Sequence, residues 1–283
     1  IPRRAAILAL IAASAMALAM SFTSVAKAEP AATGIVYTAD EYGNSVSRID
    51  LGSGKVDIVP VDITPHNVQF VPGSNLLLAV GVPLLDGKEE THGNSSGGHG
   101  SSMAAGELIL LNTADILSGS KVSIAVGGHP AHVIADAEGN RAYVSNSEDD
   151  TVSVIDLEKG EAVATVSTGD YPHGLRMSPD GKSIYVANVE DGTVSVIDTD
   201  SLSEVARIKV GTAPVQVGFT PDGSRVYVSL RDENKVAVID TATRRVTARI
   251  DVGRAPIQVH ATSDSRYVYV ANQGTETKPD DTV

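Results

Sequence analysis

The 283-residue sequence contains no cysteine and no tryptophan, and aromatic residues make up only 4% of it. Without cysteine, the protein has no disulfides, no thiolate metal ligands, no cysteine nucleophile and no attachment site for c-type haem. The apolar residues are mostly Val, Ile, Ala and Leu, which suit strands that are buried on both faces. The composition therefore favours β-sheets over helical bundles, with packing between sheets as the source of stability.

Positive charge is also scarce. The sequence has 22 Lys and Arg residues and 35 Asp and Glu residues, which gives a net charge of -13. Removal of residues 1–28, which carry three positive charges, gives about -16 for the remaining chain. A strongly acidic surface repels the phosphate backbone of nucleic acid. We therefore expect no nucleic-acid partner.

The first 28 residues have the pattern of a cleaved signal peptide. Arg3 and Arg4 precede an apolar run over residues 5–20, and Ala26-Lys27-Ala28 provides a small-x-small cleavage site. A membrane anchor is the alternative, but the run is short and rich in alanine for a full span. We predict cleavage after Ala28, a periplasmic or extracellular location in a bacterium, and no membrane span in the mature chain.

A repeat of 42 residues organises the sequence from residue 29 onward. Its period is visible in matched tyrosines and glycines, namely Tyr143, Tyr185, Tyr227 and Tyr269, and Gly127, Gly169, Gly211 and Gly253. The unit over residues 171–211 fits four strands separated by turns, one of them the Ser-Pro-Asp-Gly sequence at residues 178–181. Four short strands in a period near 40 are typical of a β-propeller blade.

The number of strands indicates an incomplete ring. We count three strands, then four complete units, then about two and a half strands, with a His/Gly/Ser-rich insert at 81–106. The fold class is therefore predicted as an all-β propeller over residues 29–283, with five to six blades present. We expect seven blades in a complete, monomeric ring, and an exposed sheet edge and aggregation in a chain that lacks its C-terminal strands.

The repeated pieces resemble a known family. Ser-Pro-Asp-Gly at 178–181, Tyr-Val-Ala-Asn at 185–188 and Thr-Val-Ser-Val-Ile-Asp at 193–198 are similar to the YVTN-family β-propeller repeat. This resemblance implies a propeller in secreted or periplasmic proteins, without implying one activity. A weaker similarity to cytochrome d1 haem and nitrous oxide reductase propellers implies histidines near the axis for haem or copper.

The candidate site residues gather on one face of the predicted ring. The loop that leads into each first strand and the loop between the second and third strands lie on the same face, because the chain alternates ends within a blade. Imidazole and thioether groups on such loops are suitable ligands for copper or zinc. The candidates are His66, His92, His99, Met103, His132 and His173. For the residues of the insert, the alternative is an incidental low-complexity segment. For His132, the alternative is a polar lining of the channel, since later units of the repeat carry Gln216 and Gln258 at the same position.

Three functions remain open at this point. The first is an exported, non-enzymatic binding platform that captures a metal ion, a protein or a small molecule. The second is a metal-dependent hydrolase of lactonase type, which needs Glu, Asp and Asn converging on the axis and is disfavoured by the His and Gln found there. The third is a d1-type haem-binding or assembly protein. No residue is assigned a catalytic role.

Overall fold

The computed structural model describes residues 32–84, 105–275, 277–280 and 282–283. The described strands form six successive antiparallel sheets and one short hairpin. The first sheet has three strands, β1 (Ile35–Asp40), β2 (Ser45–Asp50) and β3 (Val56–Pro60). The second has four, β4 (Ile63–Phe70), β5 (Leu76–Pro83), β6 (Ala105–Asn112) and β7 (Lys121–Gly128).

The next three sheets repeat the four-stranded pattern. The third contains β8 (Pro130–Ala135), β9 (Arg141–Asn146), β10 (Thr151–Asp156) and β11 (Glu161–Ser167). The fourth contains β12 (Pro172–Met177), β13 (Ser183–Asn188), β14 (Thr193–Asp198) and β15 (Ser203–Lys209). The fifth contains β16 (Pro214–Phe219), β17 (Arg225–Leu230), β18 (Lys235–Asp240) and β19 (Arg245–Asp251).

The sixth sheet has two strands, and short 3₁₀ helices occupy some of the connections. The sheet consists of β20 (Pro256–Ala261) and β21 (Val268–Asn272), and the hairpin of β22 (Gly274–Thr275) and β23 (Lys278–Pro279) follows it. The 3₁₀ helices are η1 (Glu41–Gly43), η2 (Thr113–Ser118) and η3 (Arg231–Glu233). Among the described residues, no helix has the length and apolar content to cross a bilayer. The predicted signal peptide lies outside the described residues.

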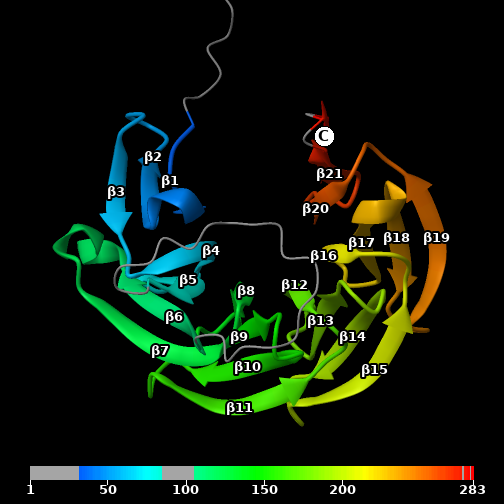
Figure 1. Cartoon of the computed structure of the whole chain (residues 1–283), viewed down its shortest axis with the longest axis horizontal. Coiled ribbons are helices and arrows are strands. Elements are labelled where there is room, and N and C mark those ends of the chain that lie inside the picture. Colours follow the sequence, from blue (N-terminus) through cyan, green and yellow to red (C-terminus); the bar gives the residue numbers. More distant parts are fainter. Residues whose placement is uncertain (1–31, 85–104, 276, 281) are drawn as a thin grey trace, which may run out of the picture.

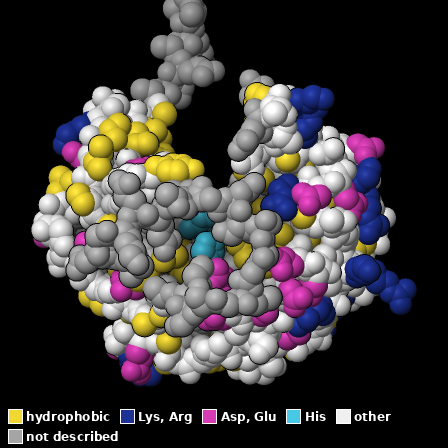
Figure 2. Space-filling view, viewed as in Figure 1, with side chains coloured by type: hydrophobic (Ala, Val, Ile, Leu, Met, Phe, Trp, Pro, Cys, Tyr) yellow, Lys and Arg dark blue, Asp and Glu magenta, His cyan; other side chains and the backbone are white. Residues whose placement is uncertain are grey.

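The sheets stand side by side on an arc around a common axis. Figure 1 shows β4, β8, β12 and β16 on the inner side of the arc and β7, β11, β15 and β19 on the outer side. Lys and Arg side chains lie toward the periphery of this face in Figure 2. The predicted all-β propeller of four-stranded blades is confirmed, and the strands of each sheet follow the order that the repeat predicted.

Local turn chemistry explains why the repeat folds this way. In the Ser-Pro-Asp-Gly turn, the Asp180 carboxylate accepts hydrogen bonds from the Ser178 hydroxyl at 2.6 Å and the Lys182 amide at 3.2 Å. Gly181 adopts φ of 73°, a value that favours glycine. The hydrogen bond from Ser178 lowers the pKa of Asp180. Asp180 therefore has a structural role in this turn.

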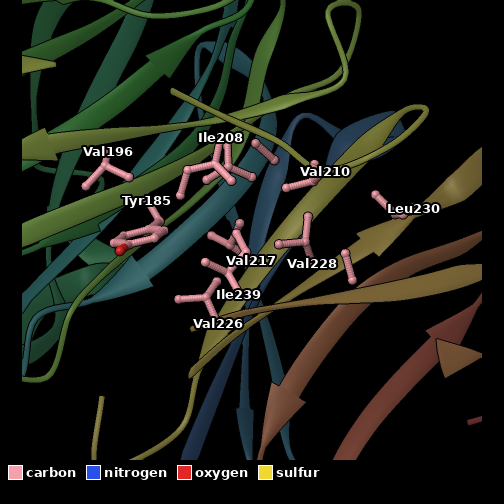
Figure 3. Packing of buried hydrophobic residues seen from close by; sticks show 12 residues of the cluster. Tyr185, Val196, Ile208, Val210, Val217, Val226, Val228, Leu230 and Ile239 are labelled. Atoms are coloured by element: carbon pink, nitrogen blue, oxygen red, sulfur yellow. The ribbon is translucent and has the colours of Figure 1, made fainter. Parts of the chain in front are cut away.

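Apolar side chains from neighbouring sheets form the core. Figure 3 shows Tyr185 and Val196 of the fourth sheet beside Val217 and Val226 of the fifth. The repeated tyrosines Tyr143 and Tyr185 are buried and pack in the core between sheets. Tyr269, the equivalent residue of the sixth sheet, is 55% exposed because no described sheet covers the far side of β20 and β21.

Candidate metal site on the propeller axis

The inner strands of the second to sixth sheets share a local irregularity that presents side chains to the axis. Each has a register shift directly after its proline, at Pro65, Pro130, Pro172, Pro214 and Pro256. Four of the residues before these prolines, His129, Tyr171, Ala213 and Ala255, have a positive φ of 48° to 57°. This bend takes the chain from the outer strand of one sheet to the inner strand of the next.

Three histidines from three successive sheets meet at this irregularity. His66 lies on β4, His132 on β8 and His173 on β12, and one ring nitrogen of each lies within 4.8 Å of the others. The ring centroids are 5.8 Å apart for His66 and His132, 5.4 Å for His66 and His173, and 4.8 Å for His132 and His173. We call these residues the histidine triad. Figure 2 shows histidine side chains, in cyan, at the centre of the face.

Two of the three rings are buried enough to stay neutral. His132 is 5% exposed, and burial, followed by the nearby His173 and His66, lowers its pKa well below the usual 6.5. His173 keeps some exposed surface, but protein atoms surround its ring closely, and burial lowers its pKa to about 4. Neutral imidazole is the form that binds a metal ion, so these two rings are ready ligands at neutral pH.

The Ser145 hydroxyl links the backbones of two triad strands. The Ser145 hydroxyl donates to the His173 carbonyl at 2.6 Å, and the Ser145 Oγ accepts from the His132 amide at 3.1 Å. The Nδ1 of His173 lies 3.3 Å from the Val215 carbonyl oxygen. A ring nitrogen that faces a carbonyl carries the proton, which leaves the lone pair of His173 on Nε2.

In later units of the repeat, a glutamine occupies the position of His132. Gln216 is 1% exposed, its Oε1 accepts from the Val217 amide at 3.0 Å, and its Nε2 donates to Gln258 Oε1 at 3.3 Å. Gln216 is thus a structural amide in a polar lining. The Nδ1 of His132 is buried and has no hydrogen-bond partner among the described residues. The polar-lining interpretation therefore accounts for Gln216 but leaves His132 unexplained.

The structure brings together three of the six predicted ligands. His66, His132 and His173 form the one group of three or more potential metal-ligating side chains found in the described ranges. His92, His99 and Met103 lie outside the described residues, so their participation stays a prediction. Glu41, whose Oε1 lies 3.8 Å from the Nδ1 of His66, was not among the residues predicted from the sequence. The signal was present in the repeat, because Glu41 occupies the place taken by Ser147, Val189 and Arg231 in other units.

Carboxylates line the loops around the triad. The Asp149 carboxylate accepts from the Gly128 amide at 2.7 Å, and the Glu233 carboxylate accepts from the Thr212 amide at 2.5 Å. These two hydrogen bonds connect the loops of neighbouring sheets. Figure 2 shows Asp and Glu side chains, in magenta, near the histidines on this face.

Comparison with known proteins agrees with this architecture. Residues 111–228 match the model of the family described as YNCE-like beta-propeller. The chain is a β-propeller protein. The predicted YVTN-type resemblance is thereby confirmed, whereas the similarity to haem and copper propellers stays a prediction.

The solved structures similar to this β-propeller include a hydrazine synthase chain from Kuenenia stuttgartiensis. The match has 24% sequence identity and a TM-score of 0.60, and it covers 76% of this chain and 58% of the other. At this identity the likeness shows the fold alone, and this β-propeller spans little more than half of the chain that it matches. No curated protein gives a significant match.

Proposed function

We propose that the protein is an exported binding platform that holds one transition-metal ion, copper or zinc, in the histidine triad on the propeller axis. The observation that carries this proposal is the convergence of His66, His132 and His173 within 4.8 Å while the buried Nδ1 of His132 has no described partner. A buried polar atom without a partner costs about 1–3 kcal/mol. A ligand that uses this cluster offsets that cost.

The donor set suits a borderline transition metal. Three imidazoles bind zinc and copper well, whereas calcium and magnesium prefer oxygen ligands. Three protein ligands leave a position free on a four-coordinate ion. His92, His99 and Met103 of the insert at 81–106 are our proposed source of further ligands at that position.

The metal should bind with a stoichiometry of one to the triad. We expect the purified mature protein, titrated with Zn²⁺ or with Cu⁺ in the presence of a competing chelator, to take up one equivalent that the triple variant His66→Ala/His132→Ala/His173→Ala does not bind. Elemental analysis and the absorption spectrum of the same protein identify the resident group. A second triple variant, His92→Ala/His99→Ala/Met103→Ala, measures binding by the insert.

Two results would contradict this proposal. One is a wild-type protein that takes up neither metal. The other is tight uptake that survives in the variant without the triad and disappears in the variant without the insert ligands. A visible haem band in the purified protein would instead favour the haem-binding alternative.

A further inference from the structure

We propose that Glu41 is a positioning residue for the metal site, which orients the His66 ring toward the propeller axis. This inference rests on the proposed function. The Oε1 of Glu41 and the Nδ1 of His66 are 3.8 Å apart, beyond hydrogen-bond distance and close enough for an ion pair when the imidazole is protonated. A carboxylate that moves slightly closer and accepts a hydrogen bond from the Nδ1–H group leaves the Nε2 lone pair for the metal.

His66 is the member of the triad that most needs such a partner. Its side chain is 35% exposed, whereas His132 is buried and His173 faces the Val215 carbonyl. An exposed ring rotates more freely about its side-chain bonds, so holding it in one orientation costs conformational entropy when the metal binds. A carboxylate already beside Nδ1 reduces that cost.

The repeat shows that the position of Glu41 faces the next sheet. The corresponding residue of the third sheet is Ser147, whose hydroxyl donates to the Pro172 carbonyl at 2.8 Å, next to His173. Glu41 holds the equivalent position relative to Pro65 and His66, and its carboxylate lies 3.8 Å from the His66 ring. Across the six sheets, Glu41 is the one carboxylate at this position, and its counterparts are Val82, Ser147, Val189, Arg231 and Gln273.

Hydrogen bonds fix the Glu41 loop relative to His66. Asn44 ends η1 with φ of 48°, and its amide donates to the Glu41 carbonyl at 3.4 Å. The Asn44 Oδ1 accepts from the Thr64 hydroxyl at 3.3 Å, and the Asn44 carbonyl accepts from the Val61 amide at 3.0 Å. Thr64 stands two residues before His66 on β4. The backbones that carry the carboxylate and the imidazole are therefore tied together.

Substituting Glu41 tests this role directly. We expect Glu41→Gln to weaken binding of Zn²⁺ or Cu⁺ by about 10- to 100-fold, the range typical of carboxylates that orient a metal-bound histidine. The stoichiometry and the melting temperature of the metal-free protein should not change. The matched control is Glu148→Gln, which removes a charge from the equivalent loop of the third sheet; its affinity should stay within about twofold of wild type.

A double-mutant cycle separates positioning from a general electrostatic effect. In a His66→Ala background, Glu41→Gln should have no further effect on affinity, because the carboxylate acts through that ring. Equal affinity of Glu41→Gln and wild type would overturn this inference alone. An equal loss in Glu148→Gln, or a full additional loss in the His66→Ala background, would also overturn it. A wild-type protein that binds no metal would remove the proposed function itself.

Discussion

His132→Ala is expected to weaken metal binding by at least about 100-fold, the largest effect of any single substitution in the triad. His132 is the most buried of the three rings, so a bound ion at its nitrogen is well shielded from water. Loss of one of three protein ligands at about 3 kcal/mol corresponds to a factor of roughly 100 in affinity. Competition titration against a chelator of known affinity measures this change.

Two further variants serve as controls for the loss of metal binding in His132→Ala. His260→Ala removes an exposed imidazole of β20 that does not belong to the triad, and its affinity should match wild type. His132→Gln introduces the residue that occupies the equivalent position at Gln216. It leaves no large cavity, so a loss of metal affinity in this variant is not caused by one. If both His132 variants fold and bind metal as tightly as His260→Ala, the triad is not the binding site.

Acidification of the metal-free protein is expected to destabilise wild type by about 2 kcal/mol more than His173→Gln between pH 7 and pH 4.5. In the folded protein, burial lowers the pKa of His173 from 6.5 to about 4. Within that window the unfolded chain takes up a proton that the folded protein does not. The free energy of unfolding therefore falls as the pH falls from about 6.5 toward 4. Above this range His173 is neutral in both the folded and the unfolded state, so this loss of stability is absent.

Urea denaturation at a series of pH values, with a chelator present, measures this difference. Carboxylates such as Asp222, whose hydroxyl and amide donors lower its pKa to about 2, are common to both proteins and cancel in the comparison. Burial also lowers the pKa of His132, so the free energy of unfolding of the double variant His132→Gln/His173→Gln should depend still less on pH. Parallel curves for wild type and His173→Gln would contradict the assignment of a buried, neutral His173.

The fold could be predicted from the sequence because its signals are local. The turn residues Asp180 and Gly181 specify the same geometry wherever they recur, and the spacing of Tyr143 and Tyr185 fixes how far apart equivalent strands lie. The exception, Tyr269, shows what a local signal lacks. Burial of that position depends on a neighbouring sheet, which the residues of the unit itself do not provide.

The site could be predicted only in part. The alternation of strands placed His66, His132 and His173 on one face, but not at one point, because His132 holds a different place in the repeat from the other two. His66 and His173 directly follow their prolines, whereas His132 follows Pro130 by two residues. All three histidines lie within the register shift that follows each proline, and the sequence pattern did not predict this shift. Glu41 was missed because a glutamate in a surface turn also has an ordinary interpretation as a solvated charge.

X-ray absorption at the edge of the bound metal is the most direct test of the histidine triad as a metal site. For the protein loaded with one equivalent of zinc, the triad predicts three imidazole nitrogens at about 2.0–2.1 Å, with the outer-shell scattering of imidazole rings. The same spectrum from the His132→Ala variant should lose one imidazole. A first shell of oxygen ligands with no imidazole scattering, identical in both proteins, would contradict the triad as the site.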